Sequence, residues 1–379
     1  MTGNLILIVV VATALAFDFT NGFHDTANAM ATTIATGALS PRVAVGLAAV
    51  LNVVGAFLSI QVAATIAKGI VDAQAVTLPI IFAGLLGGIT WNLATWYFGL
   101  PSSSSHALIG GILGATIVAV GTDAIKGTAI ISKVLVPAVF SPLIAGGVAV
   151  IGTIVAYRLT QRTHEGSRKR GFRVGQIASS SMVSLAHGTN DAQKTMGVIT
   201  LALITNGSIS PDSDPPTWVI LAAATAIGLG TYVGGWRVIA TLGHRITAIE
   251  PPQGFAAQSA SATVILAASQ VGFPLSTTHV CSGGIIGSGV GRRYATVDWG
   301  VAGQMVAAWV LTLPMAALVG GSAVWLANDA IGGTAGIIVV GAIALLGAFA
   351  VWAASRRRPI GAAAVGATTS IDAGATALA

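Results

Sequence analysis

Two short stretches of hydroxyl side chains interrupt otherwise apolar sequence and have the composition of an anion site. Residues 101–106 read PSSSSH, and residues 274–279 read PLSTTH. Proline, serine and threonine favour the first turn of a helix, so each stretch predicts a helix N-terminus. The backbone N–H groups and positive dipole end found there attract anions, and the hydroxyls add neutral donors. We therefore predict that a tetrahedral oxyanion binds to the hydroxyls of both stretches: Ser103, Ser104, Ser105, Ser276, Thr277 and Thr278. The alternative role for these hydroxyls is to cap the helices alone.

Two acids stand at matching positions of a second repeated motif. Residues 22–30 read GFHDTANAM and residues 188–196 read GTNDAQKTM, which aligns Asp25 with Asp191. A carboxylate inside a membrane is costly, and such acids usually mark ion or proton paths. We predict that Asp25 and Asp191, with the adjacent His24, bind the coupling ion. The alternative is that each aspartate caps a helix break. Asp18 is a weaker candidate, because Ser184 stands at its position in the other motif.

The two motifs differ where Asn28 aligns with Lys194. A lysine there could neutralise Asp191, contact the anion or take the place of a metal ion; the alternative is that it reaches out to the membrane surface. Two acids would repel an oxyanion unless a cation accompanies it. Protons, sodium ions or a divalent metal would each satisfy this requirement, so the residues predict coupled binding of cation and anion and leave the metal undefined.

Both motif pairs belong to a chain with the composition of a membrane protein. It has 379 residues, of which 54% are hydrophobic and 8% charged, and its mean hydropathy is +0.84. Soluble domains carry about 25% charged residues, so we predict a polytopic protein in the lipid bilayer. The single cysteine, Cys281, excludes an internal disulfide. The basic composition is assigned to cytoplasmic loops and not to nucleic-acid binding. We see no cleavable signal peptide and expect no bound cofactor.

The fold class predicted is an all-α polytopic membrane protein with two inverted-topology repeats, broken helices and two re-entrant helical hairpins. Segments 78–120 and 252–290 are interrupted only by the hydroxyl stretches and are assigned to the hairpins. Segments 3–38 and 174–204 contain the acids, and each is predicted to be one broken span. The remaining apolar segments lie at about 42–66, 129–157, 217–243, 298–327 and 332–354.

The predicted units follow from this pattern. They are a first repeat (1–157), a basic cytoplasmic linker (158–173), a second repeat (174–327), an extra transmembrane helix (328–355) and a disordered cytoplasmic tail (356–379). With the linker inside, the N-terminus lies outside and the C-terminus inside. Of the 18 lysine and arginine residues, all but four then lie on the cytoplasmic side, as the positive-inside rule requires. The four exceptions are Lys68, Lys126, Lys133 and Lys194.

The motifs GFHDTANA (22–29), PSSSSH (101–106), AHGTNDAQK (186–194) and PLSTTH (274–279) resemble the signatures of the inorganic phosphate transporter (Pit) family. The resemblance covers about residues 3–355 and is strongest to the bacterial low-affinity, proton-coupled branch. It implies import of inorganic phosphate with protons or sodium, through an elevator or rocking cycle, by a homodimer in the inner (plasma) membrane; we predict protons. It also implies that the transported species is phosphate alone or phosphate in a neutral complex with a divalent metal. Substrate binding maps onto the acids, the hydroxyl stretches, Asn28 and Asn190, and we add Lys194 from the charge argument.

Other functions fit parts of the sequence. Gln258 stands where many family members carry a glutamate, which argues against a sodium site there, yet sodium coupling remains an alternative. A sulfate or other oxyanion permease would share this architecture. A Ser/His hydrolase within the membrane would not explain the duplicated nucleophile. An anion channel would favour a pore lined by Arg or Lys over buried acids. We predict a transporter and not an enzyme.

Overall fold

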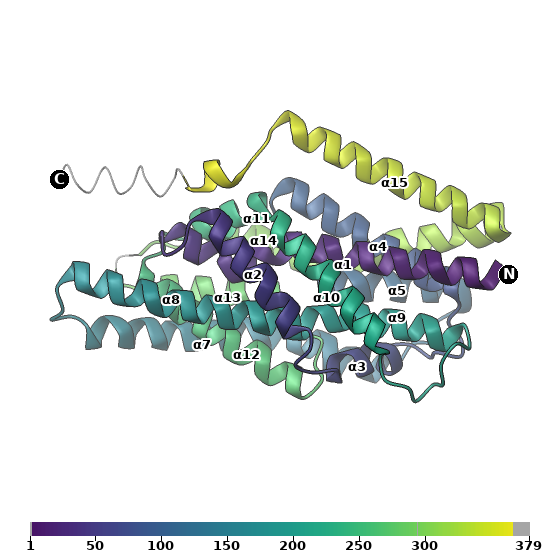
Figure 1. Cartoon of the computed structure of the whole chain (residues 1–379), viewed down its shortest axis with the longest axis horizontal. Coiled ribbons are helices and arrows are strands. Elements are labelled where there is room, and N and C mark those ends of the chain that lie inside the picture. The colour runs from purple at the N-terminus through teal and green to yellow at the C-terminus, as the bar shows by residue number, and fades with distance from the viewer. Residues whose placement is uncertain (1, 294, 367–379) are drawn as a thin grey trace.

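The computed structural model is built from helices and describes residues 2–293 and 295–366 (Figure 1). Most helices lie along the long axis of the view in Figure 1, and α15 runs along one side of the molecule. Among the described residues, extended pairing is limited to two isolated β-bridges, Val71 with Ile125 and Thr247 with Val297. The all-helical class predicted from the sequence is confirmed.

The first half contains α1 (Thr2–Ala35), α2 (Pro41–Gly55), α3 (Gln61–Gly69), α4 (Leu78–Phe98), α5 (Ser104–Val120), α6 (Gly127–Ile130), a π-helical turn (Ile131–Leu135) and α7 (Val136–Leu159). The second half contains α8 (Glu165–His187), a π-helical turn (Gly188–Ala192), α9 (Gln193–Thr205), α10 (Thr217–Val233), α11 (Trp236–Ala240), a π-helical turn (Thr241–Arg245), α12 (Pro251–Gln270), α13 (Thr277–Val290) and α14 (Trp299–Trp325). A π-helical turn (Leu326–Ile331) and α15 (Gly333–Arg357) follow.

The packing pairs equivalent helices of the two halves. Helix α1 packs on α10, and its counterpart α8 packs on α2. Helix α14 of the second half covers α4 and α5, whereas α7 of the first half covers α12 and α13. We call the turn that carries each hydroxyl stretch a hydroxyl tip: residues 101–106 form the first tip and residues 274–279 the second. Each half therefore contributes the helix that covers the other half's hydroxyl tip. This reciprocal pattern agrees with a duplicated fold; the inverted orientation in the membrane remains a prediction.

Glycines at the repeated positions allow these helices to touch through their backbones. A side chain on Gly114 of α5 would collide with the backbone of Ala317 in α14. At the matching Gly287 of α13, the collision would be with Gly146 in α7. A Cβ atom at either position would push the helices apart, which explains why the sequence repeats glycine there.

The first predicted break is absent, whereas the second is present. Helix α1 is continuous through Asp25 and contains no proline that would interrupt it. The second acidic motif instead forms the π-helical turn Gly188–Ala192 between α8 and α9. An unpredicted break divides segment 42–66 into α2 and α3. Helix α8 begins at Glu165, so much of the expected linker is helical. The expected disordered tail is helical at its start, because α15 extends to Arg357 and residues 362–366 form a helical turn, and residues 367–379 lie outside the described part.

Several helices have the length and composition of membrane spans. Among the described residues, five helices meet this test, and a sixth span is formed if the pair Thr217–Val233 and Trp236–Arg245, bent by 58°, crosses as one. Seven crossings were expected. Helix α4 meets the test at 21 residues, whereas α5 has 17, so the re-entrant assignment of the first hairpin remains a prediction. Large apolar side chains on the outer faces of α7 and α15 are exposed, as expected for helices that contact lipid.

The predicted topology can be tested by cysteine labelling in a Cys281→Ala background. Ser167→Cys, in the basic segment, should react with an impermeant thiol reagent only from the cytoplasmic side. Ser210→Cys, in the loop after α9, should react only from outside, because one crossing separates the two positions. Both serines are exposed, so each substitution is mild. Labelling of both cysteines from the same side would contradict the inverted arrangement.

Candidate functional site

Each hydroxyl stretch forms a short extended segment that ends at the start of a helix. Gly99 adopts a left-handed conformation (φ 67°) at the end of α4, and Gly272 does so (φ 73°) after α12. The Ser103 hydroxyl accepts a hydrogen bond from the His106 backbone N–H at 3.1 Å, and Ser276 accepts one from that of His279 at 3.2 Å. The predicted helix starts are therefore present. These two serines are N-caps, while the following hydroxyls belong to the first turns of α5 and α13.

The second hydroxyl tip lies against both acids. Thr277 Oγ1 donates to Asp191 Oδ2 at 2.9 Å, and Thr278 Oγ1 donates to Asp25 Oδ1 at 3.3 Å. Asn28 Nδ2 donates to Thr278 Oγ1 at 3.0 Å. These contacts join α1, the π-helical turn after α8 and the start of α13. The structure thus brings both repeated acids to one tip.

Lys194 joins the two tips to one of the acids. Its ammonium group forms an ion pair with Asp191 and donates to Ser105 Oγ at 2.5 Å and to the Leu275 carbonyl at 2.7 Å. Ser105 Oγ also donates to the Leu275 carbonyl at 3.1 Å, so the tips contact each other directly. Lys194 is 1% exposed, which rules out the alternative that it extends to the membrane surface. Its charge is available at the place where the anion was predicted.

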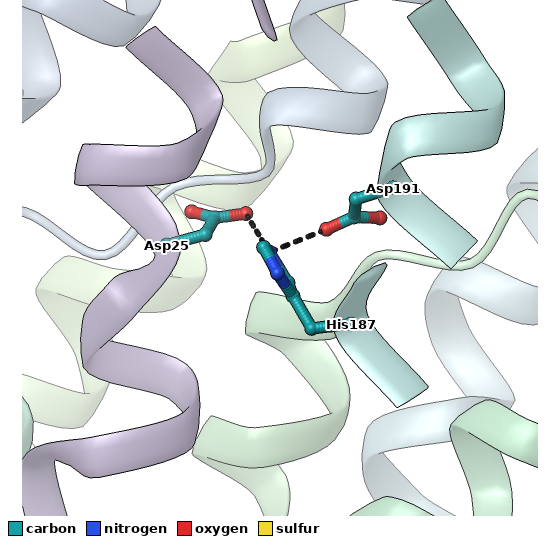
Figure 2. Close-up of side chains that lie close together, drawn as sticks. All are labelled: Asp25, His187 and Asp191. Carbon is teal, nitrogen blue, oxygen red and sulfur yellow. Dashed lines mark ion pairs between the residues drawn. The ribbon is translucent and has the colours of Figure 1, made fainter. Parts of the chain in front are cut away.

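His187 is the site residue that sequence reasoning did not select. Figure 2 shows its ring between the two acids: Nε2 lies 2.8 Å from Asp191 Oδ2 and 3.9 Å from Asp25 Oδ2. The signal in the sequence was its spacing, four residues before Asp191, which places both side chains on one helix face. The aligned residue in the other motif is Asn21, so comparison of the repeats did not single out this histidine.

The hydrogen bonds around His187 leave Nε2 directed at the acids. Thr231 Oγ1 donates to the Ile227 carbonyl, so it accepts the bond from Asn52 Nδ2 at 2.8 Å. That bond turns Asn52 Oδ1 toward His187 Nδ1, 3.1 Å away, where it can only accept. A neutral His187 then carries its proton on Nδ1 and offers a lone pair at Nε2. Asp25, His187 and Asp191 can each present one ligand atom, with all three atoms within 4.8 Å of one another.

Two predicted residues, His24 and Asn190, support the centre through bonds to neighbouring elements. His24 Nδ1 lies 2.6 Å from Asp25 Oδ1, and its Nε2 lies 3.1 Å from Thr95 Oγ1, so the imidazole orients the acid. Asn190 Nδ2 donates to Ser269 Oγ at 2.9 Å and to the Phe273 carbonyl at 3.1 Å, which ties the π-helical turn to the segment before the second tip. In this structure His24 and Asn190 therefore bond to other groups of the protein and hold the site in position.

The site is enclosed, and one of its hydroxyls has no partner. Every predicted site residue and His187 is at most 3% exposed. Ser104 Oγ is buried and makes no hydrogen bond to any described residue, unlike the neighbouring Ser103 and Ser105. A buried hydroxyl without a partner is unusual and fits a donor that is used by a ligand. Because the centre is closed on all sides, an ion can reach it only if helices move.

Comparison with known proteins gives consistent matches. The model of the Phosphate transporter family matches residues 21–320. A "Probable low-affinity inorganic phosphate transporter" of Mycobacterium bovis is 58% identical, with 99% of this chain and 91% of the relative covered. A protein of the same name from Bacillus subtilis is 46% identical, with 86% of this chain and 98% of the relative covered. A solved structure described as "The sodium-dependent phosphate transporter" superposes with a TM-score of 0.73 at 26% identity, covering 86% of this chain and 98% of that one.

The unpartnered hydroxyl gives a direct test of the anion site. Ser104→Ala removes one donor, and hydrogen bonds to charged groups contribute about 1.5–3 kcal/mol, so affinity for the oxyanion should fall roughly tenfold to a hundredfold. The measurement is binding of inorganic phosphate to purified protein. Thr116→Val is the matched control, because Thr116 is a buried hydroxyl of the same helix that bonds to its own backbone. Equal affinities for wild type and Ser104→Ala would contradict the site.

Proposed function

Because this chain belongs to the phosphate transporter family, we propose that it imports inorganic phosphate by symport with protons and takes the anion together with a divalent cation. Phosphate transport follows from family membership; direction, coupling and the accompanying cation are the proposal. The observation that carries it is the junction of two hydroxyl tips with two acids and one lysine in a single buried centre.

The tips provide the groups that an oxyanion needs. Phosphate oxygens accept hydrogen bonds, and Ser104 together with the first N–H groups of α5 and α13 can donate them. The Lys194 ammonium lies within hydrogen-bond distance of the first tip and adds a positive charge. Asp25 and Asp191 have the opposite effect, because each carboxylate repels the anion. A cation between the acids and the phosphate removes this repulsion.

The acids and His187 provide the groups that a divalent cation needs. Two carboxylates and an imidazole suit ions such as Mn²⁺ or Co²⁺ and, through the oxygens, Mg²⁺ or Ca²⁺. In this arrangement the metal is cargo and enters with phosphate as a neutral complex. A neutral cargo lowers the electrostatic barrier to crossing the apolar part of the protein, which is the physical advantage of moving both ions together.

Two positions support protons over sodium as the coupling ion. Lys194 already pairs with Asp191 Oδ1, which disfavours sodium at that oxygen, whereas the divalent cation is assigned to Oδ2, on the side of His187. Gln258 is neutral and fully engaged: it donates to the Ala29 carbonyl at 2.8 Å and to Thr33 Oγ1 at 2.9 Å, and it accepts from Ser179 at 3.3 Å. Sodium coupling remains the alternative, since the solved relative is described as sodium-dependent.

A Ser/His hydrolase is poorly supported by the geometry of the tips. Ser103 and Ser276 accept bonds from the backbone N–H groups of His106 and His279, and among the described residues neither hydroxyl lies within hydrogen-bond distance of an imidazole nitrogen, as a nucleophile would. The two imidazoles instead contact each other edge to face, with ring centres 4.8 Å apart. A sulfate permease is a closer competitor, because sulfate has the same tetrahedral shape as phosphate, and competition between the two anions distinguishes them.

We expect uptake of labelled phosphate into proteoliposomes to rise with an inward proton gradient and to stop when a protonophore is added. Replacing sodium by potassium or choline should change the rate by less than about twofold. An excess of sulfate should leave uptake nearly unchanged. In Lys194→Ala the site loses its fixed positive charge, so phosphate affinity should fall at least about tenfold and added sodium should partly restore it. Uptake that requires sodium and ignores pH would refute proton coupling while leaving phosphate transport intact.

The accompanying cation is tested by removing divalent metals and one ligand. Chelation should reduce wild-type phosphate uptake, and Mg²⁺, Ca²⁺ or Mn²⁺ should restore it. In His187→Gln the metal concentration for half-maximal uptake should rise at least about tenfold, because one of three ligands is lost. His164→Gln, in the exposed segment before α8, is the control. Uptake that is independent of divalent metals would show that phosphate travels without them.

A further inference from the structure

Asp18 is a buried acid that the proposed cargo site does not use. It lies in α1 seven residues before Asp25, which places it on the same helix face about 10 Å along the axis. Its side chain is 0% exposed, and neither carboxylate oxygen receives a hydrogen bond from any described residue. Its neighbours Asn21 and Thr195 are also buried, and each has a side-chain oxygen without a partner.

The three buried acids therefore differ in how their charge is compensated. Asp191 has Lys194, Thr277 and His187 around its oxygens, and Asp25 has His24 and Thr278. Asp18 has no ion pair and no hydrogen bond of normal geometry in the described chain, and the polar groups that act on it at short range, Thr195 and Asn21, are neutral. An ionised carboxylate in this position would be stabilised neither by water nor by a cation, so the neutral form is favoured. A protonated Asp18 can donate its hydrogen to the free oxygen of Asn21 or Thr195.

The groups that face Asp18 make its protonation depend on the cargo site. The titratable side chains whose charges act on it are Asp191 and His187. Helices α4 and α10, which pack against α1, contain no Asp, Glu, His, Lys or Arg, and α9 contains only Lys194, which is paired with Asp191. Negative charge at Asp191 favours a proton on Asp18, whereas positive charge at the cargo site disfavours it. Such an effect is reciprocal, so a proton on Asp18 changes the affinity for cargo.

We propose that Asp18 carries the coupling proton, at a site separate from the one that binds phosphate and its cation. This inference rests on the proposed proton symport. It assigns binding of the cargo to the residues around Asp25 and Asp191 and assigns the response to the proton gradient to Asp18. Its oxygens, with those of Asn21 and Thr195, could also ligate sodium; that is the competing outcome of the test.

The experiment compares two assays on reconstituted full-length protein. Exchange of labelled for unlabelled phosphate, without a pH gradient, reports the cargo site. Accumulation driven by an inward proton gradient reports coupling. Asp18→Asn, which keeps the size but cannot exchange a proton, should reduce accumulation at least tenfold while exchange stays within about threefold of wild type. Asp25→Asn should lose both activities, and Asp72→Asn, in an exposed loop, should lose neither.

Each result decides the assignment. Normal proton-driven accumulation by Asp18→Asn would overturn it, and so would a loss of exchange in a variant that is still folded by thermal unfolding and size exclusion. Asp18→Glu should restore part of the accumulation, since it returns a titratable group. If wild-type accumulation requires sodium and Asp18→Asn abolishes that requirement, Asp18 binds sodium and the proton assignment is wrong. A wild type that ignores the pH gradient overturns the proposed coupling, whereas a responsive wild type with a responsive Asp18→Asn overturns only this inference.

Discussion

The need to compensate negative charge where water is scarce determines how the centre of this protein is built. Asp25 and Asp191 are buried, so each requires donors or cations from the protein itself. The second tip supplies Thr277 and Thr278, while His187 at the end of α8 and Lys194 at the start of α9 flank the π-helical turn that carries Asp191. These requirements draw residues from α1, α8, the π-helical turn after it, α9 and α13 to one point. The same groups then determine which cargo can bind, because a site already rich in acids accepts phosphate only with a positive partner.

The helices can meet at this point because their contacts use very little side-chain volume. Gly22 of α1 lies against the backbone of α10 near Gly230, and Gly188 lies against the backbone of α2 near Asn52. Both glycines belong to the acidic motifs, so the motif that carries the acid also carries the close contact. Larger residues there would separate the helices and move the acids away from the tips. Charge and packing are therefore specified together in one short stretch of sequence.

Much of this organisation could be predicted, since it depends on patterns that repeat. Apolar length identified the helices, and the paired PSSSSH and PLSTTH stretches predicted where α5 and α13 begin. The continuous α1 was missed because a buried acid was equated with an unwound backbone, although a helix can carry acids on one face without breaking. His187 lies in a motif but was not selected as a site residue, because the orientation of its ring depends on Asn52, which is 135 residues away. Asp18 has no counterpart in the other repeat, so comparison of the repeats lowered its rank although its burial is complete.

The reciprocal cover of the tips affects the order in which the protein can be made. Helix α14, which packs on α4 and α5, is synthesised nearly 200 residues after α5 begins. Ser104 and Ser105 therefore enter the bilayer on a ribosome-bound chain long before their covering helix exists. Helix α7, by contrast, is present before the hairpin it covers has been translated. The first hairpin needs a temporary neighbour during this interval, either lipid headgroups or the insertion machinery, whereas the second finds its cover in place. Both tips end up covered in the same way, but they do not acquire their covers in the same order.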